Sequence, residues 1–298
     1  MRCTSNYDVS SDIYNISFNM STADRDSTVI DDNPVPNPPF WGSKCVEHIP
    51  LRAVVPYINR TTLYKFQWGY KAHGKGPEEY KNWAREEIDP ILNRLVAKSE
   101  SEKVLQPQAV YGYYPCQSQD GELIIYIDQE GKHERCRFTF PRQQGGRHLC
   151  IADFFRSVSS GEIDVVAFQL VTVGQHAADY ARDLFHTDQY QEYLYWHGLN
   201  VESTEGLAEY VHKRIRSELG FGREDSRIIS DMIKQRYRGS RYSFGYPACP
   251  NLHDQAKIIE LLGAERIHVV MGDEDQLWPE ESTSAIVVHH PEAKYFSV

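Results

Sequence analysis

The sequence lacks the features that mark membrane-spanning, secreted and zinc-binding chains. Its 298 residues contain no apolar run approaching the length of about 18 residues that a membrane span requires. The N-terminus does not begin with basic residues followed by an apolar core, as a signal peptide does. The six cysteines include no pair in C-x-x-C spacing, so neither a zinc ribbon nor a redox motif is indicated. We therefore expect a reducing, cytoplasmic setting.

Signatures of common enzyme sites are missing as well. No G-x-G-x-x-G follows a first predicted strand, which argues against a Rossmann-type site. No G-x-S-x-G is present, so no serine nucleophile elbow is expected. His289 and His290 are neighbours in a predicted strand, and strand neighbours point to opposite faces, so the pair does not predict a shared metal ion. Neither a catalytic triad nor a metal site is expected.

The net charge of −10 argues against nucleic-acid binding, which requires a basic surface. The charge is uneven, however, because residues 212–241 hold nine basic residues against four acidic ones. The basic residues are Lys213, Arg214, Arg216, Arg223, Arg227, Lys234, Arg236, Arg238 and Arg241. Two interpretations stay open: a solvated helical face with its own ion pairs, or a docking surface for an acidic partner.

The composition divides the chain near residue 37. Residues 1–33 are rich in Ser, Thr, Asp and Asn, contain no glycine and show no sustained hydrophobic period. Prolines concentrated over residues 34–39 then favour an extended backbone. We predict a disordered or linker segment over residues 1–37 and a single folded domain over residues 38–298.

The hydrophobic pattern of the domain predicts helices and strands that do not alternate regularly. Pro77 opens a helix with acidic residues in its first turn, residues 177–219 have helical periodicity, and residues 119–121 form a hairpin turn. Strands are predicted over residues 109–114, 122–128, 134–140, 149–154, 165–173, 266–271 and 284–289. This order predicts an α+β fold, with a mainly antiparallel, twisted sheet flanked by helices and without Rossmann topology.

The run RYRGSRYSFGYPACP, residues 236–250, is the stretch most typical of a ligand site. It places Arg241 four residues ahead of Gly245, a residue type that admits a ligand close to the main chain. Pro247 and Pro250 fix the backbone and keep the loop rigid. A cation beside a rigid turn favours a preformed site in which backbone groups make most of the contacts to the ligand. The alternative is a surface arginine before an ordinary proline-rich turn.

The motif GYPACP with its preceding arginine resembles the S-adenosylmethionine-binding signature of the activation domain of cobalamin-dependent methionine synthase. Further blocks are similar to that domain, in its order, from about Pro38 to the C-terminus. They are PPFWGSK (38–44), YGYYPC (111–116), FTFPRQ (138–143), CIADF (150–154), AEYVHKRIR (208–216) and HPEAKYF (290–296). Matching blocks over that length carry more weight than one short motif.

The resemblance implies reductive methylation of cob(II)alamin to methylcobalamin, with S-adenosylmethionine as the methyl donor. Cobalamin would be held by the cobalamin-binding module of methionine synthase, and the electron would come from a flavodoxin-like or other flavoprotein. Transfer of a methyl cation to cobalt needs no proton transfer, so we expect no catalytic residue here, only positioning and exclusion of water. The chain would be a methyltransferase module that cannot make methionine alone.

The resemblance also assigns ligand-binding residues. Arg241 would bind the carboxylate of S-adenosylmethionine with planar, charge-assisted donors, and Glu205 would take an outer role near the positive charges of the ligand. The backbone of residues 245–249 would read the adenine, and Tyr295 and Phe296 would supply further backbone contact. The turn residues are Gly245, Tyr246, Pro247, Ala248 and Cys249.

One position departs from the pattern of the family. The family often has an aspartate in the Y-I/L-D stretch of its first helix, where it contacts the amino group of the ligand, whereas this chain has Asn59. Asparagine keeps an acceptor oxygen but loses the charge, which would weaken the hold on an ammonium group by ~1 kcal/mol. Alternatively, Asn59 is a bystander.

Two functions from different classes stay open. The first is the activation module described above. The second is a standalone docking or binding module for a corrinoid protein or flavoprotein, without turnover of its own. The sequence predicts no membrane partner, and it fits a natural standalone protein and a fragment of a longer chain equally well.

Overall fold

One antiparallel sheet organises the protein, which is described here as a computed structural model covering residues 28–30 and 32–298. Its strands run in the order β4-β3-β2-β5-β9-β6, and β1 pairs with β2 beside β3. The strands are β1 (Gly42–Val46), β2 (Gln108–Gln119), β3 (Glu122–Tyr126), β4 (Glu134–Thr139), β5 (Asp164–Thr172), β6 (Ser240–Ser243) and β9 (Ser282–Val288). Every pair is antiparallel, which confirms the predicted α+β class.

The longest strand, β2, carries a proline in its interior. Two strands share one of its edges: the pairing with β1 ends at Tyr113, and the pairing with β3 begins at Cys116. Pro115 lies between these two points, where a missing N–H group interrupts no ladder on that edge. The motif YGYYPC is therefore a continuous strand whose partner changes at its proline.

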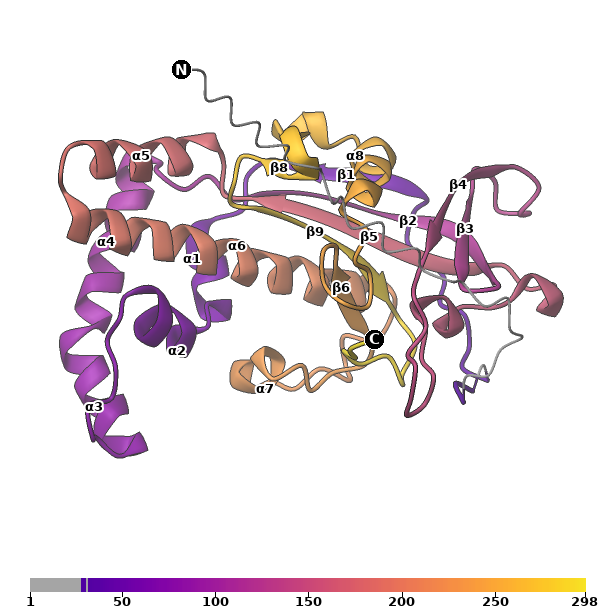
Figure 1. Cartoon of the computed structure of the whole chain (residues 1–298), viewed down its shortest axis with the longest axis horizontal. Helices are drawn as coiled ribbons and strands as arrows, with labels where there is room; N and C mark the ends of the chain where they lie inside the picture. Colours follow the sequence, from indigo (N-terminus) through magenta and orange to yellow (C-terminus); the bar gives the residue numbers. More distant parts are fainter. Residues whose placement is uncertain (1–27, 31) are drawn as a thin grey trace, which may run out of the picture.

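The two faces of the sheet bury separate cores. Along β2, Tyr111 and Tyr113 belong to one core and Val110 and Tyr114 to the other, as the two-residue period of a strand requires. Helix α6 (Tyr190–Glu218) runs along the first face together with the N-terminal helices, and α8 (Gln255–Leu262) covers the second (Figure 1). The remaining helices are α1 (Leu51–Val54), α2 (Arg60–Thr62), α3 (Pro77–Glu87), α4 (Asp89–Glu102), α5 (Gln175–His186) and α7 (Ile229–Ile233).

Two predicted strands are wrong. Residues 149–154 instead form a 3-10 turn at Ile151–Phe154, because the Asp153 carboxylate accepts a hydrogen bond from the Cys150 N–H and caps the turn. Residues 266–271 contain the end of a second 3-10 turn, Ala264–Ile267, and then only the two-residue strand β7 (Val270–Met271). This strand pairs with β8 (Leu277–Trp278) outside the main sheet. In both places, residues of strand-like composition begin a 3-10 turn or end one instead of joining the main sheet.

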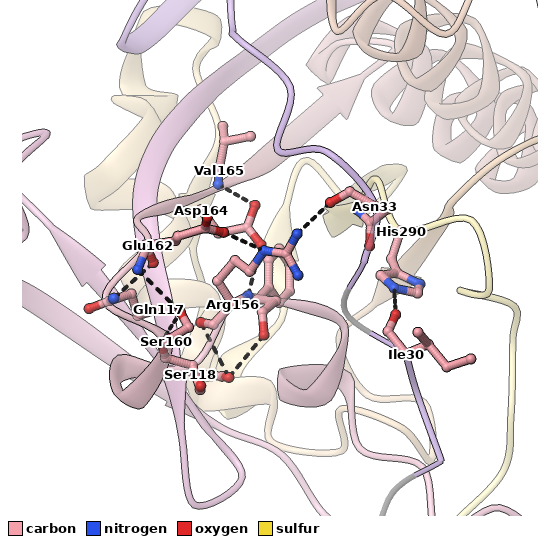
Figure 2. Close-up of polar contacts among 12 residues, drawn as sticks. Ile30, Asn33, Gln117, Ser118, Arg156, Ser160, Glu162, Asp164, Val165 and His290 are labelled. Atoms are coloured by element: carbon pink, nitrogen blue, oxygen red, sulfur yellow. Dashed lines mark hydrogen bonds and ion pairs between the residues drawn. The ribbon is translucent and has the colours of Figure 1, made fainter.

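The segment ahead of the domain is tied to the sheet by backbone carbonyls (Figure 2). The Asn33 carbonyl accepts a hydrogen bond of 2.6 Å from the Arg156 guanidinium, and the Ile30 carbonyl accepts one of 2.8 Å from His290 Nε2. Arg147 Nε donates to the Thr28 hydroxyl at 3.0 Å. Residues 1–27 of the predicted linker lie outside the described residues, and the boundary at residue 37 stays a prediction.

A membrane-spanning helix is not found in the described part of the chain, since none of its helices is both long and apolar enough.

Candidate functional site

Arg241 lies on β6, the last strand of the main sheet path, opposite Val287 of β9. Its side chain is mostly buried on the α6 face of the sheet. There Nη1 donates to Glu209 Oε2, and Nη2 lies 3.3 Å from Glu205 Oε2. The side chain of Glu209 is 7% exposed, whereas that of Glu205 is 53% exposed. A buried carboxylate therefore fixes the guanidinium, and an exposed one occupies its outer donors.

Glu209 is itself held from three directions. Besides Arg241, it accepts a hydrogen bond of 3.0 Å from the Tyr237 hydroxyl and one of 3.5 Å from Arg216 Nη2. Arg216 in turn pairs with Asp225 at 2.9 Å, with both side chains only 3% exposed. This buried network leaves Glu205 as the partner of Arg241 that a ligand can displace.

The acidic residues of α6 that face this region follow helical spacing. Glu202, Glu205 and Glu209 stand at positions i, i+3 and i+7, which lie on one side of a helix. Glu202 is buried, and its burial raises the pKa of its carboxyl to about 7; the Gln67 side chain opposes this shift and the charge of Glu205 adds to it. The site therefore contains more carboxyl groups than its arginine can neutralise.

Asn59 is the N-cap of α2, where its side-chain oxygen accepts a hydrogen bond of 3.2 Å from the Thr62 N–H. The preceding residues press against α6, because a Cβ atom on Gly206 would lie 3.2 Å from the Ile58 nitrogen. Glu205 precedes Gly206 on the helix. The segment that ends at Asn59 and the strand that carries Arg241 thus both meet α6 at Glu205 and Gly206.

The turn after β6 is closed by its own backbone. The Gly245 N–H donates to the Cys249 carbonyl at 3.0 Å, and the Cys249 N–H donates to the Tyr246 carbonyl at 2.9 Å. Gly245 has a φ of +89°, Tyr246 is 57% exposed, and Pro247 is also exposed. Ala248 and Cys249 are buried, and burial raises the pKa of the Cys249 thiol to about 12. This thiol is a packing residue that donates to the Ser243 carbonyl at 2.9 Å.

Gly245→Ala tests the strain in this turn. We expect it to lower the free energy of unfolding by about 1–3 kcal/mol, because an L-residue at this φ is strained. A Cβ atom would also approach Leu252 Cδ2 to 2.9 Å. Gly74→Ala is the matched control, since Gly74 has a φ of +84° and open space around it. Equal losses for both variants in urea unfolding would show that the Leu252 contact contributes nothing.

Phe296 lies on the other side of β6 from Arg241. The Phe296 ring packs against Tyr242 at 5.8 Å between centroids, and Tyr242 alternates with Arg241 along the strand. Phe296 is buried, whereas Tyr295 is 47% exposed. The Phe296 side chain therefore does not meet Arg241, and only the backbone of this segment and the Tyr295 side chain remain available at the surface.

A cleft of about 600 Å³ adjoins the turn from the α8 side. Phe244, which precedes Gly245, and Leu252, which contacts it, both line this cleft. Arg241 and the carboxylates of α6 do not. The cleft and the cluster formed by Arg241 and the α6 carboxylates therefore meet only at the turn after β6.

Most of the nine basic residues of 212–241 have partners, as the first interpretation of this region predicted. Arg214, Arg216, Arg236, Arg238 and Arg241 form ion pairs with acidic side chains, and Lys213 donates to a tyrosine hydroxyl. Arg223, Arg227 and Lys234 are exposed and take part in none of the ion pairs among the described residues. The possible docking surface is reduced to these three cations around the exposed Ile228.

The two adjacent histidines point to different partners. His289 Nε2 lies 2.8 Å from the Asp164 carboxylate, and His290 bonds the Ile30 carbonyl. Across residues 28–30 and 32–298, no group of three or more His, Cys, Asp and Glu side chains is arranged to hold a metal ion.

Sequence reasoning missed Glu202 and Glu209. The signal that could have revealed them is the spacing of three glutamates along one side of an otherwise largely buried helix. Acidic residues on a core-facing side need a counter-charge or a ligand.

Comparison with known proteins relates the chain as a whole to proteins of known type. The family described as vitamin B12 dependent methionine synthase, activation domain, matches residues 50–298. Methionine synthases of Mycobacterium tuberculosis and Mycobacterium leprae are each 44% identical to the chain, over 286 and 278 residues. These matches cover 91% and 89% of the chain but only 24% and 23% of the relatives, so the chain spans about a quarter of their length.

A solved structure agrees with the sequence comparisons. The crystal structure of the MetH reactivation domain bound to AdoHcy matches with a TM-score of 0.81 and 25% sequence identity. The match covers 89% of this chain and 83% of that one. The overall arrangement of sheet and helices is therefore shared with that domain.

Proposed function

Since the chain belongs to the family of vitamin B12-dependent methionine synthase activation domains, we propose that it binds S-adenosylmethionine beside Arg241 and presents the methyl group for reductive methylation of cob(II)alamin. The related structure is bound to AdoHcy, the demethylated form of this methyl donor. The observation that carries the proposal in this chain is a buried guanidinium whose outer donors are occupied by an exposed, exchangeable carboxylate.

The charges of the site match those of the ligand. Arg241 receives the carboxylate of S-adenosylmethionine in exchange for Glu205, while Glu209 keeps the guanidinium in place. The released Glu205 then lies free to meet the positive charges of the ligand, the ammonium and the sulfonium. Three glutamates against one ligand-facing arginine favour a ligand with net positive charge.

The turn after β6 supplies the remaining contacts. β6 is the last strand of the main sheet path, and its continuation over residues 245–249 offers backbone groups of fixed geometry for the adenine. Tyr246 and Tyr295 are both exposed and contribute aromatic surface. Asn59, at the start of α2, provides a neutral acceptor toward the amino group.

The methyl donor supplies a methyl cation, which together with one electron converts cob(II)alamin into methylcobalamin and leaves S-adenosylhomocysteine. This chain contributes binding and orientation: Arg241 anchors one end of the donor, and the rigid turn anchors the other. No side chain has to move a proton during the transfer. The rate advantage comes from holding the sulfonium carbon in line with its acceptor and away from water.

The partners follow from this chemistry. We infer that the cobalamin-binding module of methionine synthase docks against the exposed side of the Arg241 site, because the methyl group must reach cobalt directly. We also infer a flavodoxin-like or other flavoprotein as electron donor, recognised by Arg223, Arg227 and Lys234, which are exposed cations in an acidic protein. We assign methyl transfer to the complex of this chain with the cobalamin-binding module and the electron donor.

Calorimetric titration of S-adenosylmethionine into the purified chain tests the proposal. We expect saturable binding at one site, with S-adenosylhomocysteine competing for it. A folded chain that binds neither molecule would refute the ligand assignment. The docking module for a corrinoid protein or flavoprotein, without turnover, would then be the favoured function.

A further inference from the structure

Glu202 is a buried carboxyl group to which the proposed function gives no role. It lies on α6 midway between two glycines, Gly198 and Gly206, that touch neighbouring backbone or side chains closely. A Cβ atom on Gly206 would meet Ile58, and one on Gly198 would lie 2.7 Å from Gln67 Cβ. The chain from residue 58 to residue 67 therefore crosses α6 on the side to which Glu202 points, and Asn59 begins that crossing.

Within the described part of the chain, Glu202 forms no ion pair, and no cation is among the groups that shift its pKa. Gln67, the residue of the crossing segment that acts on the Glu202 carboxyl, carries an uncharged amide, and so does Asn59 at the start of that segment. The two cations of that segment are engaged elsewhere: Arg60 pairs with Asp89 at 3.0 Å, and Lys65 lies over the Tyr80 ring.

The charged groups on the other sides of Glu202 are also paired with other residues or carry a negative charge themselves. Along α6, Glu205 is the charged neighbour that acts on it, and from β6 the cation Arg241 is bound to Glu205 and Glu209. On the sheet side of α6, Glu281 pairs with His197 at 3.6 Å. The residues that the structure describes therefore supply no counter-charge to Glu202.

We propose that Glu202 supplies the negative charge that Asn59 lacks, and that its carboxyl group gives up its proton to solvent when the ammonium of S-adenosylmethionine binds beside it. This inference rests on the proposed function and assigns Glu202 as a positioning residue of the same site. When the ligand carboxylate displaces Glu205 from Arg241, two carboxyl groups one turn apart face the incoming positive charge. Ionisation of Glu202 then becomes favourable.

The affinity for S-adenosylmethionine should rise with pH between 6 and 7. The pKa of Glu202 is about 7 in the free protein, so about half of these carboxyls are protonated at pH 7 and about nine-tenths at pH 6. Binding that requires the ionised form therefore tightens roughly fivefold between pH 6 and pH 7. The α-amino group of the ligand stays charged over this range because its ordinary pKa is about 7.8.

Titration calorimetry in two buffers of different ionisation enthalpy measures the proton release directly. The wild-type chain should release about half a proton per S-adenosylmethionine at pH 7 and about 0.9 at pH 6. Glu202→Gln should bind more weakly, by about tenfold at pH 7, and should release no proton. Glu192→Gln is the matched control on the same helix, since Glu192 pairs with Arg94 at its far end, and it should behave like the wild type.

A rescue variant separates a charge effect from damage to the fold. Asn59→Asp in the Glu202→Gln background returns a carboxylate to the site, and aspartate caps α2 as well as asparagine does. We expect this double variant to recover most of the affinity while keeping it independent of pH between 6 and 7.

Two results would overturn the inference while leaving the proposed function intact. One is wild-type binding without proton release at pH 6 and pH 7. The other is a Glu202→Gln variant that keeps the wild-type pH dependence. Absence of any binding by the folded wild-type chain would refute the proposed function, and this inference with it.

Discussion

Arg241→Ala should abolish measurable S-adenosylmethionine binding, with a loss in affinity of about 100-fold or more, and should destabilise the fold as well. The affinity falls because the ligand carboxylate loses its charge-assisted donors. The free energy of unfolding should fall by about 3 kcal/mol, because Glu209 stays buried without its main counter-charge. Titration calorimetry and urea unfolding measure the two effects separately.

Two further variants separate ligand binding from folding. Arg241→Lys keeps the positive charge but not the planar pair of donors, so most of the stability should return while binding stays weakened. Combining Arg241→Met with Glu209→Gln removes both buried charges, and this protein should regain stability without regaining the ligand. Tight binding by the double variant would show that the carboxylate of the ligand lies elsewhere.

Asp164→Asn should cost about 3 kcal/mol of unfolding free energy near pH 7. Asp164 is buried and accepts hydrogen bonds from His289 Nε2 at 2.8 Å, the Arg156 N–H at 2.8 Å and the Val165 N–H at 2.7 Å. Burial alone would raise the pKa of Asp164, but His289 and the two backbone donors hold it below its ordinary value. The stabilisation is therefore present above the unfolded-state pKa of about 4 and is lost as the pH falls through the lower folded-state pKa.

The pH dependence distinguishes this mechanism from a loss of shape. The gap in stability between the wild type and Asp164→Asn should narrow steadily in urea unfolding as the pH is lowered below about 4. Asp179→Asn is the control, because Asp179 is an exposed partner of Arg182 on α5 and its removal should cost less than about 1 kcal/mol. A gap for Asp164→Asn that stays constant down to the acid limit would mean that the carboxylate charge has no part in it.

Local sequence signals predicted most strands of the main sheet, but they did not predict which acidic residues surround Arg241. The hairpin at residues 119–121 and the strands around it are encoded by alternation and turn residues, both of which are local. Arg241 was predicted as a site residue because it stands next to an unusual turn. The short strand β6 that carries it was missed, since its four residues follow Gly239 and alternate only weakly.

The role of Glu202 could not be read from its own neighbours in the sequence. Its environment is made by a segment about 140 residues earlier in the chain, and only the folded structure brings Gln67 against α6. The strand predicted over 149–154 failed for the opposite reason, because the local hydrogen bonds between Cys150 and Asp153 outweigh the β-propensity of the run.

The backbone contacts of residues 28–33 determine how the domain would respond to a mechanical load. A pull on the chain from its N-terminal side would load the Thr28–Arg147 contact and then the Ile30–His290 and Asn33–Arg156 hydrogen bonds, before it reached the pairing of β1 with β2. These contacts lie at successive positions along the segment, so they would break one after another rather than all at once. One of these bonds ends at His290, two residues beyond β9, so tension entering from the N-terminal side would reach the main sheet through β9 before it reached β1.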